Sequence, residues 1–261
     1  MLTPMKAKNF DSLKWLTLPW LPVGFLLLTL SVIIWGPVIV LSGVLNISGG
    51  WMKFLVRSWV MLVPKYFFIR HKVYYPPNFK SEYPEKDSVI VVSNHQSLID
   101  IPYAYYAVPG NIRMLAKASL FKIPIFGLAL RAAGNIEIVR GSRGSGKSAL
   151  DDMKRKLRSG IQIWLAPEGT RSRDWHLGAF KPGAFSLALD LELPVQPIVM
   201  LNACEILPKG SLWPKVGGLL EIQVLPIVDP KKLGITDRVA LSQHVWNQMN
   251  AALVSYWQGR A

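Results

Sequence analysis

The pattern of apolar and polar positions predicts an α/β domain that follows a long apolar segment. From residue 66 onward, short runs rich in apolar and β-branched residues alternate with stretches of helix length, an order typical of a sheet flanked by helices. A closing amphipathic helix is expected from Arg238 to Trp257. The predicted strands cover residues 66–75, 88–93, 112–115, 135–140, 161–166, 195–201 and 219–226.

The apolar segment near the amino terminus has the length of a membrane helix. No charged side chain lies between Lys14 and Lys53, and residues 19–45 are enough to span a bilayer. Gly36 and Pro37 near its middle predict a kink or a turn. We therefore expect a two-helix hairpin anchor over residues 1–65, with the α/β domain of residues 66–261 on the cytoplasmic side.

Composition supports an association with membranes. Hydrophobic residues make up 51% of the 261-residue chain, charged residues only 18%, and the mean hydropathy is +0.26, which is high for a soluble enzyme. Cys204 is the single cysteine, so no internal disulfide forms and a reducing compartment is expected.

The net charge of +14 indicates an anionic partner. Between Arg113 and Lys181 there are 14 Lys and Arg but only 5 Asp and Glu. This excess suits either acidic substrates bound by that part of the chain or a cytoplasmic surface that obeys the positive-inside rule. Both alternatives favour a membrane, and we expect no nucleic-acid partner.

Polar residues follow the predicted strand 88–93 in the stretch NHQSLID. Asn94 and His95 come directly after the strand, at the end where α/β sheets bind ligands, and Asp100 follows five residues after His95. The pair can meet only if His95 lies in a loop and Asp100 in the first helical turn, with Ser97 as the helix cap. A carboxylate that orients His95 makes it a general base toward an alcohol. The alternative is that these residues only cap the helix and complement its dipole.

A second polar stretch, APEGTRS, follows the predicted strand 161–166. Gly169 permits a close backbone approach, Arg171 can bind a phosphate through two hydrogen bonds, and the hydroxyls of Thr170 and Ser172 can donate. The alternative is a Pro-Glu-Gly turn with a solvated arginine. Two such stretches at one sheet edge favour a site.

The stretch GSRGSGKS, residues 141–148, fits the phosphate-binding pattern G-x-x-x-x-G-K-S of P-loop nucleotide hydrolases. Such enzymes also need a second strand that ends in an acidic residue near the magnesium ion. The best candidate, residues 225–229, is interrupted by Pro226. We interpret residues 141–148 as a mobile basic loop and keep nucleotide hydrolysis as an alternative.

Four stretches in this order resemble the motifs of the glycerolipid acyltransferase family, and a fifth, GAFKPGAFSLAL at 178–189, is similar to the run that follows the third motif. The resemblance covers about residues 94–199. It implies a mixed central sheet flanked by helices, with no cofactor and no metal. The four stretches are NHQSLID (94–100), GNIEIVR (134–140), APEGTRS (166–172) and LPVQPIV (193–199).

The resemblance also implies roles for individual residues. His95 is expected to be the catalytic base and Asp100 its orienting partner. The residues expected to bind substrate are Asn94, Arg140, Glu168, Gly169, Thr170, Arg171, Lys181 and Pro194.

The implied reaction moves a fatty acyl group from a thioester of coenzyme A or acyl carrier protein to the free hydroxyl of a lysophospholipid. The first acceptor expected is 1-acylglycerol-3-phosphate, at a bacterial inner membrane. Glu137 stands where the family carries an apolar or aromatic residue, so another lysophospholipid is the alternative acceptor. An inactive membrane scaffold is a further alternative, which the intact His95 and Asp100 disfavour.

The remaining candidates for chemistry are weaker. Cys204 has no neighbouring histidine and is expected to be a small buried residue. His71, His176 and His244 have no carboxylate at a telling spacing and are expected to have no catalytic role.

Overall fold

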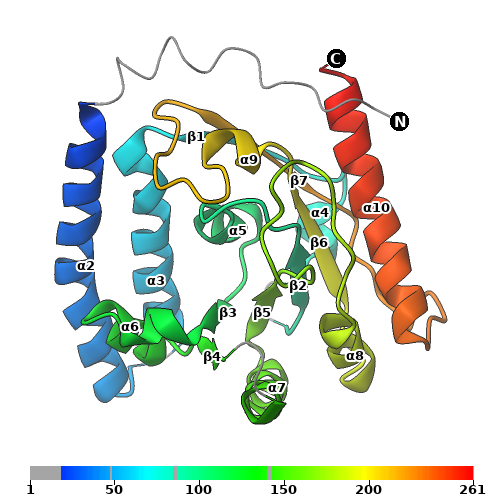
Figure 1. Ribbon diagram of the computed structural model, residues 1–261. Coiled ribbons are helices and arrows are strands. Elements are labelled where there is room, and N and C mark those ends of the chain that lie inside the picture. Colours follow the sequence, from blue (N-terminus) through cyan, green and yellow to red (C-terminus); the bar gives the residue numbers. More distant parts are fainter. Residues whose placement is uncertain (1–18, 48, 85–86, 140–142, 261) are drawn as a thin grey trace.

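The protein folds around a seven-stranded mixed sheet (Figure 1). This computed structural model describes residues 19–47, 49–84, 87–139 and 143–260, and their side chains except those of residues 143–147. The strand order is β1-β7-β6-β2-β5-β3-β4; β6 and β7 are antiparallel and every other neighbouring pair is parallel. The strands are β1 (Arg70–Tyr74), β2 (Ile90–Ser93), β3 (Ile112–Lys117), β4 (Ile136–Ile138), β5 (Gln162–Leu165), β6 (Val195–Met200) and β7 (Leu219–Val224).

Each predicted strand overlaps one strand of the sheet, so the α/β class and the mixed sheet are confirmed. Tyr66 and Phe67 are the main exception, because they belong to a 3-10 helix before β1. The helices are α2 (Trp20–Val44), α3 (Gly50–Leu62), η1 (Val63–Phe67), α4 (Phe79–Glu82), α5 (Asp100–Ala107), η2 (Ala118–Lys122), α6 (Phe126–Ala132), α7 (Arg143–Arg158), α8 (Gly183–Asp190), α9 (Ala203–Ile206) and α10 (Arg238–Gln258).

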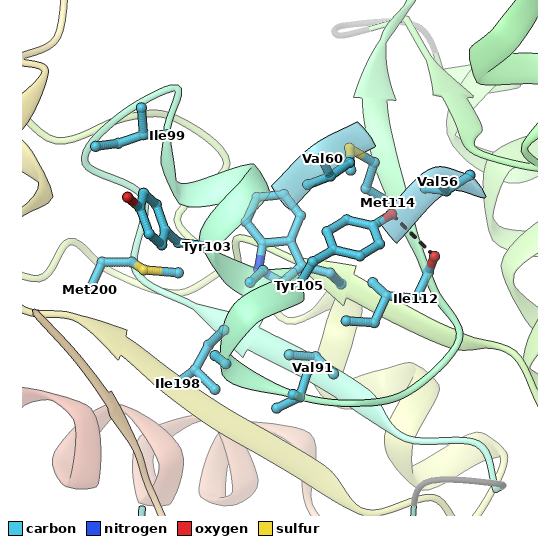
Figure 2. Close-up of a cluster of buried hydrophobic side chains, with 14 of the residues drawn as sticks. Val56, Val60, Val91, Ile99, Tyr103, Tyr105, Ile112, Met114, Ile198 and Met200 are labelled. Atoms are coloured by element: carbon cyan, nitrogen blue, oxygen red, sulfur yellow. Dashed lines mark hydrogen bonds between the residues drawn. The ribbon is translucent and has the colours of Figure 1, made fainter. Parts of the chain in front are cut away.

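Two hydrophobic layers cover the two faces of the sheet. Successive side chains of a strand point to opposite faces, so Val91 of β2 joins one layer while Ile90 and Val92 join the other. The first layer contains buried residues of α3 and α5, and Figure 2 shows Val56, Tyr103 and Ile198 within it. The second contains buried residues of α7, α8 and α10.

The helix α2 is one continuous helix of 25 residues through Gly36 and Pro37. The chain therefore does not turn at Gly36, and the reversal into α3 comes after Val44. By length and composition α2 is the one described helix that qualifies to cross a membrane, with 22% of its most apolar window buried. Glycine permits its close packing, since a Cβ on Gly36 would lie 2.4 Å from Cγ2 of Ile125.

The stretch GSRGSGKS is not a loop in the part that the structure describes. The helix α7 begins at Arg143, four residues before Lys147, so residues 143–148 form its first turns. The reason is packing: Ala149, Met153 and Leu157 repeat every four residues and are buried against the sheet. The expectation of a mobile loop over residues 141–148 is therefore wrong for residues 143–148, which form no phosphate-cradling loop before the helix, while residues 141 and 142 lie outside the described residues.

Candidate active site

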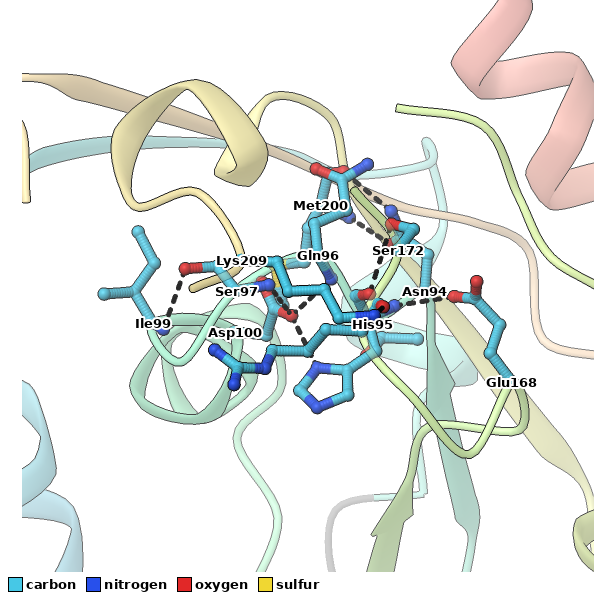
Figure 3. Close-up of polar contacts among 12 residues, drawn as sticks. Asn94, His95, Gln96, Ser97, Ile99, Asp100, Glu168, Ser172, Met200 and Lys209 are labelled. Atoms are coloured by element: carbon cyan, nitrogen blue, oxygen red, sulfur yellow. Dashed lines mark hydrogen bonds and ion pairs between the residues drawn. The ribbon is translucent and has the colours of Figure 1, made fainter. Parts of the chain in front are cut away.

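His95 and Asp100 meet at the carboxyl end of β2 (Figure 3). His95 lies in the loop and Asp100 begins α5, and Nδ1 of His95 is 2.8 Å from Oδ2 of Asp100. The same Oδ2 accepts hydrogen bonds of 2.8 Å from the backbone amides of Gln96 and Ser97. The predicted pair is thus formed, in the loop-to-helix geometry that the spacing requires.

Ser97 meets the expectation of a helix cap only in part. Its hydroxyl accepts 3.3 Å from the amide of Ile99 and donates 2.7 Å to the carbonyl of Leu207. The helix α5 itself begins after Ile99 and has no side-chain cap. The amide bonds to Asp100 close the loop instead. This arrangement fixes the carboxylate, which is fully buried, while the ring of His95 keeps 14% of its surface exposed.

The contact with Asp100 favours one tautomer of the neutral imidazole. A carboxylate accepts hydrogen bonds, so we infer that Nδ1 of His95 carries the proton and that Nε2 keeps its lone pair. Trp164 of β5 lies edge-on to the ring with centroids 6.1 Å apart, and its indole nitrogen donates 3.1 Å to the Ser93 hydroxyl. His95 is therefore held in the orientation of a general base.

Asn94 is turned away from the exposed side of the site. Its amide group donates 2.9 Å to the carbonyl of Met200 and accepts 2.8 Å from the amide of the same residue, and only 1% of Asn94 is exposed. Both hydrogen-bonding functions of the side chain are used within the protein. Asn94 thereby joins the ends of β2 and β6.

Glu168 is also occupied by backbone groups. One carboxylate oxygen accepts 2.8 Å from the amide of His95 and the other 3.0 Å from the amide of Gly178. Burial raises the pKa of Glu168 above its ordinary value, although these two hydrogen bonds favour the charged form. Glu168 ties the loop after β5 to the loop that holds His95.

The loop after β5 runs beside His95. Ser172 donates 2.7 Å from its amide to the carbonyl of His95, which sets the position of the preceding Arg171. Arg171 is half-buried, and no described residue accepts a hydrogen bond from its guanidinium. Gly169 has φ of 70°, the left-handed region that favours glycine, and Thr170 and Lys181 are exposed. Four of the expected residues, Glu168, Gly169, Thr170 and Arg171, thus lie on the loop that borders the His95–Asp100 pair, and Lys181 lies beside this loop.

Pro194 lies at the opposite end of the sheet. It precedes β6, and its carbonyl accepts 3.1 Å from the amide of Ile90 at the start of β2. Because β2 and β6 are parallel, four residues of strand, about 13 Å, separate Ile90 from Asn94. The structure therefore does not bring Pro194 to the His95–Asp100 pair, and its role in substrate binding stays a prediction.

The second motif is described in part. Arg140 lies outside the described residues. Glu137 of β4 is exposed and is 3.4 Å from Nη2 of Arg131, on the edge strand three positions away from β2.

The last candidates from the sequence are the single cysteine and the three other histidines. Cys204 is half-buried rather than fully buried as expected. Its backbone amide donates 3.1 Å to Oε1 of Gln96, and burial raises the pKa of its thiol to about 12. His71 packs on Tyr106 and His244 contacts Gln248. His176 differs from expectation, because Asp174 lies 3.2 Å from its Nδ1, but both side chains are more than half exposed.

Lys209 was not predicted as a residue of the site. It reaches the site from the loop after α9, where its ammonium group donates to the carbonyl of Arg171. No motif marks this lysine, since it lies 38 residues from its partner. Gln96, the third residue of NHQSLID, was also not predicted to have a role. Its backbone amide donates to Asp100, and its side-chain oxygen accepts from the backbone amide of Cys204.

Comparisons with known proteins agree with this architecture. Residues 76–201 match the family described as Acyltransferase. The chain is 36% identical over 129 residues to 1-acyl-sn-glycerol-3-phosphate acyltransferase BAT2, chloroplastic, of Brassica napus. This match covers 49% of this chain and 37% of the relative. It is 33% identical over 168 residues to 1-acyl-sn-glycerol-3-phosphate acyltransferase alpha of Homo sapiens, covering 64% of this chain and 59% of that one. The matches thus span between about a third and three fifths of the curated relatives.

A solved structure has the same fold over nearly the whole chain. It is the 1-acyl-sn-glycerophosphate (LPA) acyltransferase, PlsC, from Thermotoga maritima, with a TM-score of 0.76 at 24% identity, covering 93% of this chain and 96% of that one. Residues 76–201 therefore match the Acyltransferase family, and the chain resembles the glycerolipid acyltransferases as its four motifs predict.

Proposed function

We propose that this protein is an acyltransferase that moves a fatty acyl group from a thioester to the free hydroxyl of a lysophospholipid, with 1-acylglycerol-3-phosphate as acceptor and phosphatidic acid as product. The observation that carries the proposal is the imidazole of His95, fixed by buried Asp100 at 2.8 Å, beside the segment of Arg171. The names of the relatives support the choice of acceptor.

The chemistry follows from the orientation of His95. Nε2 removes the proton of the acceptor hydroxyl as the oxygen attacks the thioester carbonyl, and Asp100 stabilises the imidazolium that forms. When the carbon–sulfur bond breaks, the proton passes from Nε2 to the departing thiolate. The substrate alcohol is itself the nucleophile, so no acyl-enzyme forms.

Arg171 is proposed to bind the phosphate of the acceptor. Its guanidinium is free of hydrogen-bond acceptors in the described residues, and it can make two parallel bonds to a phosphate. We assign Asn94 and Glu168 to positioning rather than to substrate contact, because their polar atoms are engaged with the backbone.

The donor is proposed to be a thioester of acyl carrier protein or coenzyme A, both of which are acidic. The basic excess between Arg113 and Lys181 favours either one. Acceptor and product are lipids, so the site is expected at a membrane surface, the cytoplasmic face of a bacterial inner membrane. The exposed apolar side chains of α2 support this location; they include Leu26, Leu30, Ile33, Ile34, Leu41 and Val44.

The test is a transfer assay with purified full-length protein. The donor is a thioester with a labelled acyl group, either on acyl carrier protein or on coenzyme A. It is offered with a panel of lysophospholipids that differ in head group, and the product is separated by chromatography. Wild type is expected to acylate 1-acylglycerol-3-phosphate fastest, His95→Ala to be inactive, and Lys147→Ala to stay active. Absence of transfer to every acceptor would favour the scaffold, and hydrolysis of ATP lost in Lys147→Ala would favour the P-loop alternative.

The role of Arg171 has a matched control two residues away. Arg171→Ala is expected to raise KM for 1-acylglycerol-3-phosphate at least tenfold, and Arg173→Ala, which removes an exposed arginine, is expected to change it less than twofold. Equal effects of the two variants would contradict a specific contact by Arg171.

A further inference from the structure

The loop between α9 and β7, residues 207–218, ends in an apolar tip. Leu212 is 66% exposed and Trp213 is 61% exposed. Figure 1 shows this loop in gold beside α9, on the side of the sheet where α2 and α3 lie. Neighbouring large apolar side chains that stay in contact with solvent mark an interaction surface.

The tip continues into a cluster of aromatic rings at the amino-terminal end of α2. The ring of Trp213 meets Phe25 edge-on, with centroids 6.2 Å apart. The ring of Trp20 lies 5.0 Å from that of Phe68, which is 54% exposed. Tryptophan and its neighbours at one end of an apolar helix are typical of the membrane–water interface.

Phe68 provides independent support. Its φ of 52° lies in the left-handed region, which is unfavourable for a bulky residue, and its ring is nevertheless left exposed. Burial within the protein does not compensate for this backbone conformation. A ring held outward in this way gains from an apolar environment outside the protein.

The charge around the tip identifies the partner as an anionic surface. Lys209 and Lys215 flank Leu212 and Trp213, both are exposed, and residues 207–218 contain no acidic residue. Lys65, also exposed, lies in η1 just before Phe68. Basic residues around an apolar tip match a bilayer that contains anionic lipids.

We propose that Leu212 and Trp213 form a second membrane contact, distinct from α2, that enters the interface of an anionic bilayer. This inference rests on the membrane location in the proposed function. The loop also joins the membrane to the active site: the carbonyl of Leu207 accepts from Ser97, and Lys209 donates to the carbonyl of Arg171. Leu212 lies three residues after Lys209, a span of at most about 11 Å of chain. The tip thereby brings the lipid surface next to Arg171.

The test reports the environment of position 212 directly. Leu212→Cys is made in a Cys204→Ala background and labelled with the polarity-sensitive fluorophore NBD, which leaves Trp213 in place. Leu233→Cys is the matched control, because Leu233 is 52% exposed in the loop that precedes α10. With vesicles of phosphatidylcholine and 30% phosphatidylglycerol, the label at 212 is expected to shift to shorter wavelength and to brighten at least twofold. The label at 233 is expected to stay unchanged.

The same labelled proteins separate the competing outcomes. High salt or vesicles of phosphatidylcholine alone are expected to weaken the response at 212. The proposal is overturned if the label at 212 stays unchanged while the protein sediments with vesicles, if both labels respond alike, or if the protein binds no vesicles. None of these readings needs enzymatic activity, so failure of the proposed reaction leaves this arm intact.

A kinetic arm links the contact to the site. Leu212→Ala with Trp213→Ala is expected to slow acylation of long-chain acceptor in anionic vesicles at least tenfold. Acylation of a short-chain acceptor dissolved as monomers is expected to change less than twofold. Leu233→Ala with Val239→Ala, which removes two exposed apolar side chains elsewhere, is the control. Equal losses on both acceptors would show a general structural defect and would contradict the proposal.

Discussion

Replacing Asp100 by Asn tests whether its charge, rather than its shape, makes His95 a base. Asp100 is fully buried and its Oδ2 lies 2.8 Å from Nδ1 of His95. Opposite unit charges at that distance attract by about 6 kcal/mol at an effective dielectric constant of 20, or about four orders of magnitude in rate. Solvent contact of His95 and the neutral hydrogen bond that Asn keeps reduce the loss. We expect kcat to fall about 1000-fold.

The fold is expected to tolerate this substitution. The oxygen of Asn can still accept from the amides of Gln96 and Ser97, and the other oxygen of Asp100 is buried without a hydrogen-bond partner among the described residues, so replacing it loses no bond. The free energy of unfolding is expected to stay within about 1 kcal/mol of the wild-type value, which is the range of one neutral hydrogen bond. A loss of kcat at unchanged Tm therefore reports chemistry.

The assay measures initial rates of acyl transfer to 1-acylglycerol-3-phosphate, with Tm recorded for each protein. Asp174→Asn is the matched control, because Asp174 lies 3.2 Å from Nδ1 of His176 but both side chains are more than half exposed. Loss of this surface ion pair in Asp174→Asn is expected to change kcat less than twofold. The reasoning is refuted if folded Asp100→Asn keeps more than a tenth of wild-type kcat, or if Asp174→Asn loses as much.

Two other predictions concern positioning and the thiol. Asn94→Ala removes both hydrogen bonds to the Met200 backbone and is expected to lower the free energy of unfolding, measured by urea titration, by about 2–4 kcal/mol. The control Asn247→Ala replaces an exposed asparagine and is expected to change this free energy by less than about 0.5 kcal/mol. The raised pKa of Cys204, about 12, keeps the thiol protonated. Its alkylation by iodoacetamide at pH 8, followed by mass spectrometry, is expected to be at least 100-fold slower in the native protein than in urea; comparable rates would contradict the raised pKa.

The contact between His95 and Asp100 was predictable because its geometry is local. His95 and Asp100 lie on one loop after one strand, and five residues of sequence determine whether they can meet. Asn94 and Glu168 were found as members of motifs, but their contacts were not predictable. Asn94 bonds to a residue 106 positions away and Glu168 to one 73 positions away. Long-range contacts of this kind depend on the strand order, which the sequence alone did not define.

Pro194 shows a placement that strand direction could have predicted. The residue precedes an apolar run that was predicted as a strand, whereas the polar stretches of the site follow theirs. In a parallel sheet, residues before and after strands lie at opposite edges. Order along the chain marked Pro194 as part of a motif, but its side of the strand already argued against a place beside His95.

The helix α2 shows where apolar pattern alone cannot distinguish two environments. It is apolar on every side, so periodicity does not separate the face that packs on the protein from the face that is exposed. Residue size separates most of them. Gly24, Ser31, Gly36 and Ser42 are buried, together with the larger Leu21 and Ile39, whereas the exposed positions are mostly leucine, isoleucine and valine. Small residues permit close approach of helices, so their positions mark the face that packs on the protein and leave most of the larger apolar side chains exposed.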